Sequence, residues 1–508
     1  SSSAASDVYK RQLNGGYMKK KYLLISAALC LLGPVLLKVD SYFPHIPEYM
    51  MALLTGLMIG AAVLFFLKSG GGILSKILVT VYTVLFAVVT IQGVYCNPYW
   101  NTYMNTEMEY VDILGQTLSY REAEKDIDYL MHYLKKDHPM FIDGVPEDVQ
   151  QVCEKAVQEL KDEETITGIM LYRKVQNIVS VLGDAHTSGG VTQKMRHYLK
   201  DMHQKEKDGY QITAVNGIGL KELFREKEDL YCYETESRAL SRMATDLITL
   251  EGLEFLDIDP DQVRYTFRND TGEEKEAVYG MADFIPYEEY EAADVSDQDA
   301  DEKPFVSYRI DVPGSLAILT LNECKNSEEY RTCLQEMFTE VKAENIRNVA
   351  VDLRENGGGN SMVANEFIRY LDVDTYKTGT HSWRRGPFTV GGGDGVCQND
   401  IHSDLVFDGE VFVLTSADTF SSAMLFSEFI KDNHLGRIIG QPPGNAPSGY
   451  GEIAIFQLPN SKLYVQISTK KFMRADEKTE DKLVTPDILC DADKALETLY
   501  GEIGASFR

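Results

Sequence analysis

Two adjacent serines, Ser421 and Ser422, stand where an apolar strand is expected to turn into an apolar-faced helix. They belong to TFSSAMLFSEF (419–429), which closely follows the strand-like VFVLT of 411–415. A serine at the N-terminus of a helix can act as a nucleophile, because the positive end of the helix dipole stabilises its alkoxide. It can equally cap the helix by accepting a backbone N–H. The two serines alone leave both interpretations open.

A glycine run and a histidine are the other candidates for chemistry. The turn RENGGGN (354–360) contains Gly357, Gly358 and Gly359. A phosphate cradle would need a following Lys-Ser/Thr, which is absent, whereas an oxyanion hole needs only one or two N–H groups that glycine brings close. A flexible turn explains the run as well. His186, in GDAHTSGG (183–190), follows a predicted helix end and could act as a base or bond local backbone.

The elements around these residues predict an α/β fold from residue 305 onward. Strand-like stretches at 316–321 (LAILTL), 348–353 (NVAVDL) and 411–415 alternate with helical stretches, one through Met337 and Val341 and one from Ser361. Active sites of such folds gather at the carboxyl ends of the strands. Both turns of interest, 354–360 and 416–422, lie at such ends, so we expect them to form the site.

Two further regions precede the α/β part. Apolar residues at helical spacing predict helices within 119–190. Within 200–300, GYQITAVNGIGLKELF (209–224) predicts a short strand, a turn at Asn216 and Gly217, and a helix. The acidic tract YEEYEAADVSDQDADEKP predicts a solvated linker over 288–304. We therefore expect a domain boundary at this tract.

Three apolar stretches, 22–37, 50–67 and 77–95, predict three transmembrane helices within 18–96, since about 20 apolar residues span a bilayer. A cleaved signal peptide is the alternative for the first stretch, although no small-x-small cleavage site follows it. Lysines before the first stretch and between the other two, Lys68 and Lys76, place those segments on the cytoplasmic side. We therefore expect a multi-pass protein of the cell membrane, held in the lipid bilayer, with residues 97–508 outside the cytoplasm. Residues 1–17 are interpreted as an unrelated extension.

Composition limits the partners. The 508 residues carry a net charge of −28 without a basic stripe, which argues against a nucleic-acid partner. Eight cysteines show no C-x-x-C or Cys/His ligand pattern, so the sequence predicts neither a zinc site nor a disulfide framework. Cys324 and Cys333 could pair outside the cell. No metal or organic cofactor is implied.

Four ordered motifs resemble the tail-specific (C-terminal-processing) and tricorn-core family of serine peptidases. VAVDLRENGGGN (349–360) resembles the family's D-x-R-x-N-x-G-G, and TFSSA (419–423) resembles T-x-S-x-A at a helix start. EDKLVTPD (480–487) resembles E-x-x-G-V-x-P-D, and LGDAHTSG (182–189) resembles a helix-end D-x-H-T. The ITAVNG stretch is similar to the strand and turn that end the family's PDZ-like insert. The resemblance covers 119–490.

The resemblance implies roles for the serines and the glycines. Ser421, two positions after Thr419, aligns with the nucleophile. The backbone N–H of Ser422 would serve the oxyanion together with an N–H from the glycine turn, which includes Gly357 and Gly358.

The family divides according to the base that activates the serine. One branch uses a lysine about twenty-five residues downstream. Asn445 and Ala446 stand at that place, and neither can take a proton. That branch is excluded unless Lys470 or Lys471 substitutes.

The tricorn-like branch uses a histidine oriented by a glutamate. His186 matches the histidine and Glu480 the glutamate, with Asp481 as a possible alternate partner. Two residues depart from the branch pattern: Ala185 stands where a serine is usual, and Met424 stands where many members carry a glutamate.

The resemblance implies a crotonase/ClpP-like α/β catalytic core at 305–495 and a tail at 496–508. A helical subdomain at 97–195 and a degenerate PDZ-like or smaller β insert with the acidic linker at 196–304 would precede the core. The expected function is that of a membrane-anchored extracytoplasmic serine endopeptidase, which cleaves protein or peptide through an acyl-enzyme. A catalytically inactive peptide-binding or sensor protein and an esterase with the same triad are the alternatives.

Overall fold

The computed structural model describes residues 48–69, 108–269, 271–296, 304–393 and 395–504, with scattered residues between 17 and 28 and between 72 and 99. The chain forms two compact units. One comprises Ser1–Met108, Arg384–Thr389 and Ala454–Phe456, and the other comprises Glu109–Trp383, Val390–Ile453 and Gln457–Arg508. Every candidate site residue lies in the second unit.

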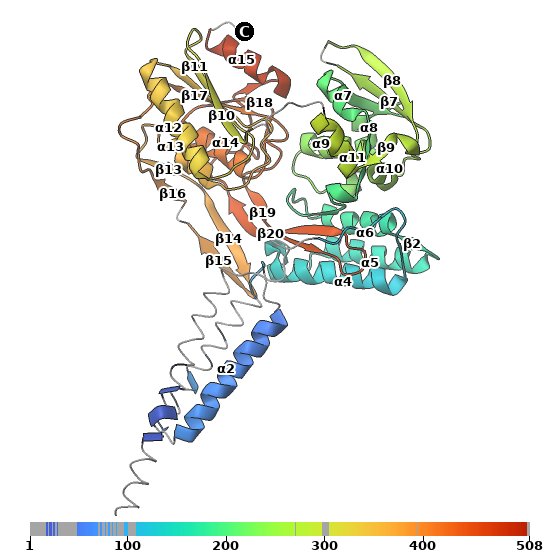
Figure 1. Cartoon of the computed structure of the whole chain (residues 1–508), viewed down its shortest axis with the longest axis vertical. Helices are drawn as coiled ribbons and strands as arrows, with labels where there is room; N and C mark the ends of the chain where they lie inside the picture. Colours follow the sequence, from blue (N-terminus) through green and yellow to red (C-terminus); the bar gives the residue numbers. More distant parts are fainter. Residues whose placement is uncertain are drawn as a thin grey trace, which may run out of the picture. The chain divides into compact units, whose positions relative to one another are not determined.

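The first unit contains helix α2 (Glu48–Ser69), which includes the stretch 50–67 that was expected to cross a membrane (Figure 1). Among the residues that the structure describes, no helix combines the length and the apolar character that a membrane crossing requires. The other two expected spans, 22–37 and 77–95, and the extension 1–17 fall largely outside the described residues.

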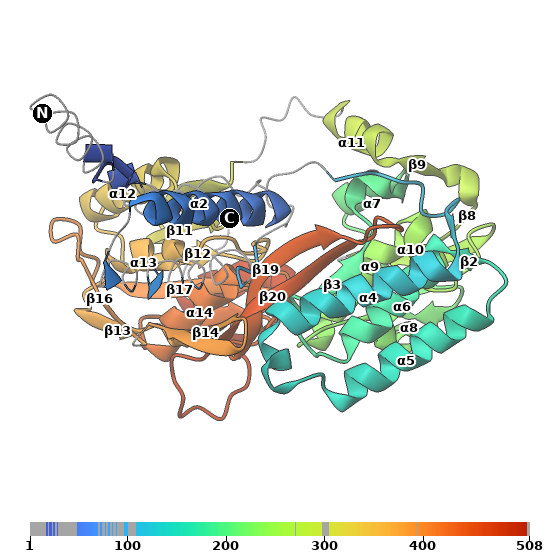
Figure 2. The ribbon, with the colours of Figure 1, turned by 90° about the horizontal axis from the view of Figure 1, so that it is seen from below.

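Three helices begin the second unit: α4 (Tyr120–Asp137), α5 (Glu147–Asp162) and α6 (Gly168–Ser180). The short strands β1 (Thr117–Leu118) and β2 (Ile166–Thr167) pair antiparallel. Ser119 and Glu122 form a capping box that starts α4. Each helix buries one apolar face, and α4 contacts α5, which contacts α6 (Figure 2). The helices predicted within 119–190 are confirmed.

The insert that follows is built on a small antiparallel sheet. Its strands are β5 (Gln211–Val215), β6 (Ile218–Gly219), β7 (Val263–Arg268) and β8 (Glu274–Tyr279), in the order β6-β5-β7-β8. The strand, turn and helix predicted at 209–224 are confirmed, because Asn216 and Gly217 turn between β5 and β6 with φ of 50° and 82°. The other elements are α7 (Met202–Lys207), α8 (Leu220–Glu226), α9 (Glu236–Leu247), α10 (Leu250–Phe255), β4 (His197–Leu199) and β9 (Phe284–Pro286). Likeness to a PDZ domain stays a prediction.

The acidic tract is not a solvated linker throughout, and this prediction was wrong for its first part. Helix α11 (Tyr287–Ser296) occupies it, and residues 297–303 lie outside the described residues. Tyr290 is buried, with its ring centroid 4.7 Å from that of Tyr198 and 3.8 Å from that of His203. One aromatic anchor therefore orders a segment whose average composition is that of a linker.

A six-stranded sheet forms the α/β core. Its strands are β10 (Val306–Asp311), β11 (Leu316–Leu321), β12 (Asn348–Asp352), β17 (Glu410–Thr415), β18 (Arg437–Gly440) and β21 (Ile488–Leu489), adjacent in that order. β10 is antiparallel to β11, and the other neighbours are parallel. The strands predicted at 316–321, 348–353 and 411–415 are confirmed.

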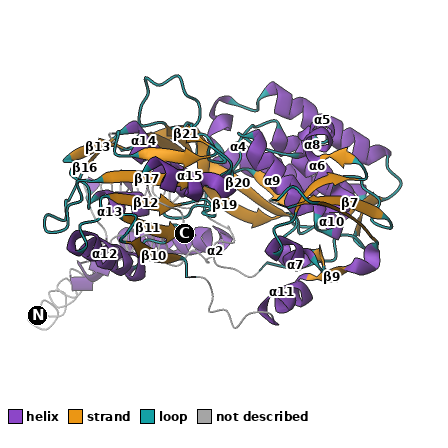
Figure 3. Ribbon diagram, turned by 90° about the horizontal axis from the view of Figure 1, so that it is seen from above, coloured by secondary structure: helices purple, strands orange, loops and turns teal. Residues whose placement is uncertain are grey.

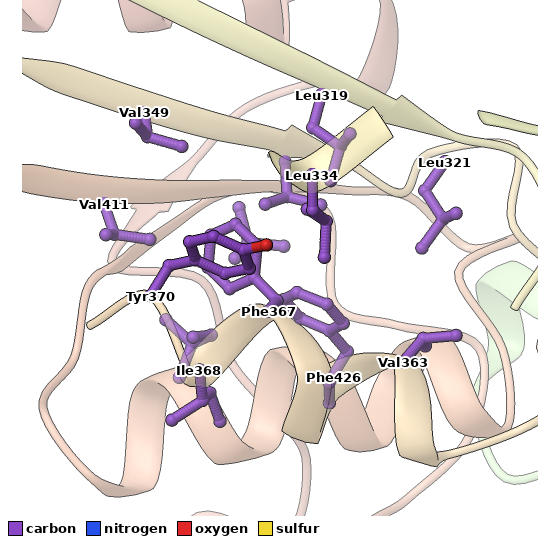
Figure 4. Packing of buried hydrophobic residues seen from close by; sticks show 14 of the residues in the cluster. Leu319, Leu321, Leu334, Val349, Val363, Phe367, Ile368, Tyr370, Val411 and Phe426 are labelled. Carbon is purple, nitrogen blue, oxygen red and sulfur yellow. The ribbon is translucent and has the colours of Figure 1, made fainter. Parts of the chain in front are cut away.

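Helices cover both faces of this sheet, because side chains alternate along each strand. Leu319 and Val411 share one buried cluster with Phe367 and Phe426, which come from α13 (Met362–Ile368) and α14 (Ser422–Asp432) (Figure 4). Helix α12 (Glu328–Ala343) contributes to the same cluster. Phe412 belongs to a second cluster with residues of α15 (Ala495–Glu502). Figure 3 shows α15 beside the strands of this sheet. The expected α/β layering is thus confirmed as a mixed α/β fold.

A second sheet joins the histidine segment to the core. It contains β15 (Phe388–Gly392), β14 (Thr380–Arg385), β20 (Tyr464–Met473) and β19 (Gly449–Gln457) in that order, and β3 (Ser188–Gly190) also pairs with β20. The short strands β13 (Thr375–Lys377) and β16 (Val396–Gln398) pair separately. Because β3 begins two residues after His186, its pairing with β20 fixes the position of the histidine loop.

Candidate active site

Ser421 occupies a strained turn between β17 and α14. Its φ of 55° and ψ of −119° lie outside the regions that non-glycine residues favour, and such strain persists only where the surroundings enforce it. Although Ser421 stands at the N-cap position, its side chain makes no capping hydrogen bond. The capping interpretation therefore does not describe Ser421. A strained strand-to-helix turn that presents a serine is the arrangement by which several hydrolase folds expose a nucleophile.

The turn after β12 and the turn after β17 are hydrogen-bonded together at the carboxyl ends of these neighbouring strands. The Thr419 hydroxyl donates to the Leu353 carbonyl at 2.8 Å and accepts the Ser416 N–H at 2.9 Å. The Phe420 N–H donates to the Asn356 carbonyl at 2.9 Å. These contacts enforce the turn that strains Ser421.

Gly358 lies directly against the candidate nucleophile. Its φ is +106°, and an added Cβ would stand 2.7 Å from the Ser421 Cβ and 3.1 Å from the Ser422 nitrogen. Its own N–H already donates to Asn356 Oδ1 at 2.9 Å. The N–H groups of Gly357 and Ser422 make no hydrogen bond with any described residue. Of the three residues expected at the oxyanion hole, Gly357 and Ser422 therefore keep their donors free.

Ser422 has a different task from Ser421. Its side chain is buried, and its hydroxyl donates to the Gly359 carbonyl at 2.7 Å. This hydrogen bond ties the start of α14 to the glycine turn. The Ser421 N–H, in turn, donates to Asn445 Oδ1 at 2.7 Å, so Asn445 holds the backbone of the candidate nucleophile.

His186 lies beside this turn, in the loop between α6 and β3. Its ring is tilted against the ring of Phe420, the residue before Ser421, with 4.5 Å between centroids. The residue is 7% exposed, and neither ring nitrogen has a hydrogen-bond partner among the described residues, although the Tyr450 backbone lies nearby. Burial lowers the pKa of His186, Asp184 opposes this shift, and Arg238 adds to it. A neutral imidazole, which can accept a proton, is thus favoured near pH 7.

Two carboxyl groups flank the imidazole. Asp184 Oδ1 lies 4.0 Å from His186 Nδ1, and ligand atoms of Asp184, His186 and Glu234 all lie within 4.8 Å of one another. A divalent cation could bridge such a spacing. Both carboxyl groups already accept hydrogen bonds, however, and Glu234 takes those of the Ala185 and Ala446 N–H groups. We therefore interpret Asp184 and Glu234 as carboxyl groups that flank the His186 imidazole, and not as ligands of a metal.

Protonation of the two carboxyl groups differs. Burial raises the pKa of Glu234 to about 7, the Ala446 N–H opposes the shift, and repulsion from Asp184 adds to it. Burial acts most strongly on Asp184 and opposes its ionisation, but the hydrogen bond and charge of His138, together with His186 and Ser468, outweigh it and lower the pKa of Asp184 to about 2. Near neutral pH, Asp184 is therefore fully ionised, whereas Glu234 is only partly ionised.

Glu480 is not brought to the histidine by any contact within the described part of the chain. It lies exposed in the loop after β20, without a hydrogen bond or ion pair to a described residue. Asp481 instead accepts the N–H groups of Leu483 and Thr485, each at 3.0 Å, and so shapes its own loop. The role predicted for Glu480 stays a prediction.

The two lysines that could have replaced the missing base lie on β20. Lys470 Nζ is 3.3 Å from Glu452 Oε2, and Lys471 is exposed. The described contacts bring neither of them to Ser421. The two cysteines expected to be able to pair, Cys324 and Cys333, are both free thiols.

Several site residues were missed by reasoning from the sequence. Asp184 and Asn356 stood inside the quoted motifs but received no role. Asn445 was noted only as the absence of a lysine. Glu234 and His138 lie in segments without any motif, so only the folded chain shows their proximity to the site.

Known proteins resemble this chain in part of its sequence and in its fold. Residues 315–490 match peptidase family S41. No curated protein matches the chain. A solved structure of mature CPAF complexed with lactacystin is 13% identical, with a TM-score of 0.53 over 75% of this chain and 96% of that chain. Another structure of mature CPAF gives the same identity and TM-score and is covered to 95%.

A third solved structure is the photosystem II D1 C-terminal processing protease, which is 14% identical, with a TM-score of 0.42 over 76% of this chain and 98% of that chain. At such low identities the CPAF structures show likeness of fold alone. The family match covers the glycine turn and the Ser421 turn. The part of the chain that carries both turns, residues 315–490, is therefore similar to peptidase family S41.

Proposed function

We propose that this chain is a serine endopeptidase that hydrolyses peptide bonds through an acyl-enzyme, with Ser421 as nucleophile and His186 as base. The observation that carries the proposal is the strained backbone of Ser421, at φ 55° and ψ −119° between β17 and α14. The same assignment is supported by the Ser421 side chain, which does not cap the helix, by the position of Gly358 against Ser421 and by the nearby neutral imidazole of His186.

The chemistry follows in two steps. His186 accepts the Ser421 hydroxyl proton while the oxygen attacks the peptide carbonyl, and the resulting oxyanion receives the N–H groups of Gly357 and Ser422. The imidazolium then gives its proton to the departing amine, which leaves an ester on Ser421. A water molecule repeats the sequence, releases the acid and restores the hydroxyl.

The resemblance gives Glu480 the task of orienting His186. This part of the proposal rests on the sequence motif alone, because Glu480 is exposed and makes no described contact with the histidine. Replacing Glu480 by glutamine tests it: loss of activity would support the resemblance, and full activity would remove Glu480 from the site.

A matched pair of serine variants tests the nucleophile. A fluorophosphonate probe should label the purified protein at Ser421, and Ser421→Ala should abolish labelling. Ser422→Ala removes only the hydroxyl that bonds the Gly359 carbonyl and keeps the backbone N–H, so labelling should persist. Labelling that survives Ser421→Ala would overturn the assignment.

Probe labelling also separates the alternatives. A catalytically inactive peptide-binding protein of the same fold would leave the probe unreacted. An esterase would react with the probe but would cleave esters in preference to peptides. A panel of peptides and esters therefore completes the test.

We further propose, from the placement of lysines in the sequence, that residues 97–508 lie outside the cytoplasm and that the N-terminal segments anchor the chain in the bilayer. The proposal has no support from the described helices. It is tested by the accessibility of the catalytic unit to protease on intact cells.

A further inference from the structure

The imidazole of His186 is buried without a hydrogen-bond partner for either ring nitrogen among the described residues. A base of this kind needs a group that fixes its orientation and stabilises the imidazolium formed when it takes a proton. Asp184 Oδ1 lies 4.0 Å from His186 Nδ1, an ion-pair separation, and Asp184 itself is fully buried.

Asp184 is held rigidly by groups on three sides. Its Oδ1 accepts the His186 backbone N–H at 2.9 Å, and its Oδ2 accepts the Thr187 hydroxyl at 2.5 Å. The same Oδ2 lies 3.1 Å from Nε2 of His138. The Asp184 carboxylate thus holds the backbone of His186 and also sets the distance between its own Oδ1 and His186 Nδ1.

His138 gives this carboxylate a donor of defined direction. Its Nδ1 accepts the Met140 N–H at 3.1 Å, so a neutral His138 carries its proton on Nε2 and donates it to Asp184. His138 is fully buried, and its ring lies 4.8 Å from that of Tyr450. Because both ring nitrogens of His138 are hydrogen-bonded within the protein, its tautomer is defined. A histidine exposed to water would have no such constraint.

The other charged groups around His186 do not take this role. The two carboxyl oxygens of Glu234 already accept hydrogen bonds from the Ala185 and Ala446 N–H groups. Arg238, on α9, carries a positive charge that disfavours the imidazolium and is paired with Asp418. Asp184 is therefore the one flanking group, among the described residues, that is fully ionised near neutral pH and lies within ion-pair distance of Nδ1.

We propose that Asp184, backed by His138, is the positioning residue that orients His186 and stabilises its imidazolium, the task that the resemblance gives to Glu480. The inference rests on the proposed function, because it assumes that His186 is the base. It accounts for how a histidine base is supported although Glu480 is exposed and makes no contact with it.

The first test does not depend on catalysis. In the Ser421→Ala protein, the titration of His186 is followed by NMR of its ring C–H signals. Asp184→Asn removes the negative charge while keeping the shape, so the pKa of His186 should fall by about one unit or more. Glu480→Gln should leave the pKa of His186 unchanged. An unchanged titration in Asp184→Asn, or a shift with Glu480→Gln instead, would overturn the inference.

The second test uses the active protein. Asp184→Asn should lower the rate of fluorophosphonate labelling at pH 7 by about 100-fold, and the acid limb of the pH profile should move to lower pH. If Asp184→Asn lost labelling but its acid limb did not move, the role of Asp184 would be purely structural, and the inference would be refuted.

A variant of the backing residue covers the case in which Asp184→Asn does not fold. His138→Phe keeps the aromatic contact with Tyr450 but removes the donor, so the acid limb should shift in the same direction with a loss of about tenfold. If His186 titrates as expected but Ser421 is never labelled, the proposed function fails, and only the effect of Asp184 on the pKa of His186 stands. If Ser421 is labelled normally in Asp184→Asn, the inference fails and the function stands.

Discussion

Replacing Gly358 by alanine should damage the nucleophile without touching any polar group. At φ +106° an alanine is strained by about 1–3 kcal/mol. Its Cβ would meet the Ser421 Cβ at 2.7 Å and the Phe420 carbonyl oxygen at 2.8 Å, both closer than real Cβ contacts. The backbone must therefore move by several tenths of an ångström, and overpacking of this kind costs roughly 1–3 kcal/mol more. The two terms together lower the free energy of unfolding by about 2–6 kcal/mol.

The displacement also reaches the reaction, because Gly358 can only move by pushing Ser421 or by shifting the neighbouring N–H of Gly357. A misplacement approaching 1 Å costs on the order of 100-fold in rate. We expect the second-order rate of fluorophosphonate labelling at Ser421 to fall by about that factor. Gly357→Ala is the matched comparison, since its Cβ meets nothing within 4 Å and its N–H remains, so it should lose far less. A Gly358→Ala protein that is labelled as fast as Gly357→Ala would refute the reasoning.

Three further outcomes are expected. Glu428 is buried, and burial raises its pKa from 4.5 to about 8. The protonated side chain therefore contributes to the free energy of unfolding. This contribution, roughly 5 kcal/mol at most, is complete below pH 4.5 and is lost as pH rises through 8. Urea unfolding at pH 5 and pH 8.5 should therefore show a smaller loss for Glu428→Gln than for the wild type, and equal losses would contradict this. The acid limb of the activity profile should lie below the histidine reference of about 6.5, because burial lowers the pKa of His186, and a limb above 6.5 would exclude the assignment. Protease added to intact cells should degrade the catalytic unit, whereas protection until lysis would reverse the proposed topology.

The strands and turns of the core could be predicted because their signals are local. Nearly continuous apolar runs such as 316–321 and 411–415 are typical of strands buried on both faces, and they form β11 and β17. Two parallel strands that lie side by side bring their carboxyl-terminal turns together. The meeting of the glycine turn with the Ser421 turn therefore follows from strand order and needs no side-chain detail.

The surroundings of His186 could not be predicted because they depend on contacts between distant segments. His138 precedes Asp184 by 46 positions, and Ala446 is 212 positions from Glu234. No periodicity relates such positions. The error at α11 has the same origin: an average over an acidic tract hides one aromatic residue, Tyr290, whose partners lie elsewhere in the chain.

Asn445 links these observations. It stands where the resemblance places the lysine base of the other branch, yet its amide oxygen holds the Ser421 N–H at 2.7 Å, and the next residue, Ala446, donates to Glu234. This loop now supports the strained nucleophile and cannot deliver a base. In the proposed mechanism the base is His186, which lies in the helical part of the chain, and its position depends on the pairing of β3 with β20. Catalysis by His186 therefore requires that this strand pairing be formed, whereas a lysine in the loop itself would need no contribution from the helical part.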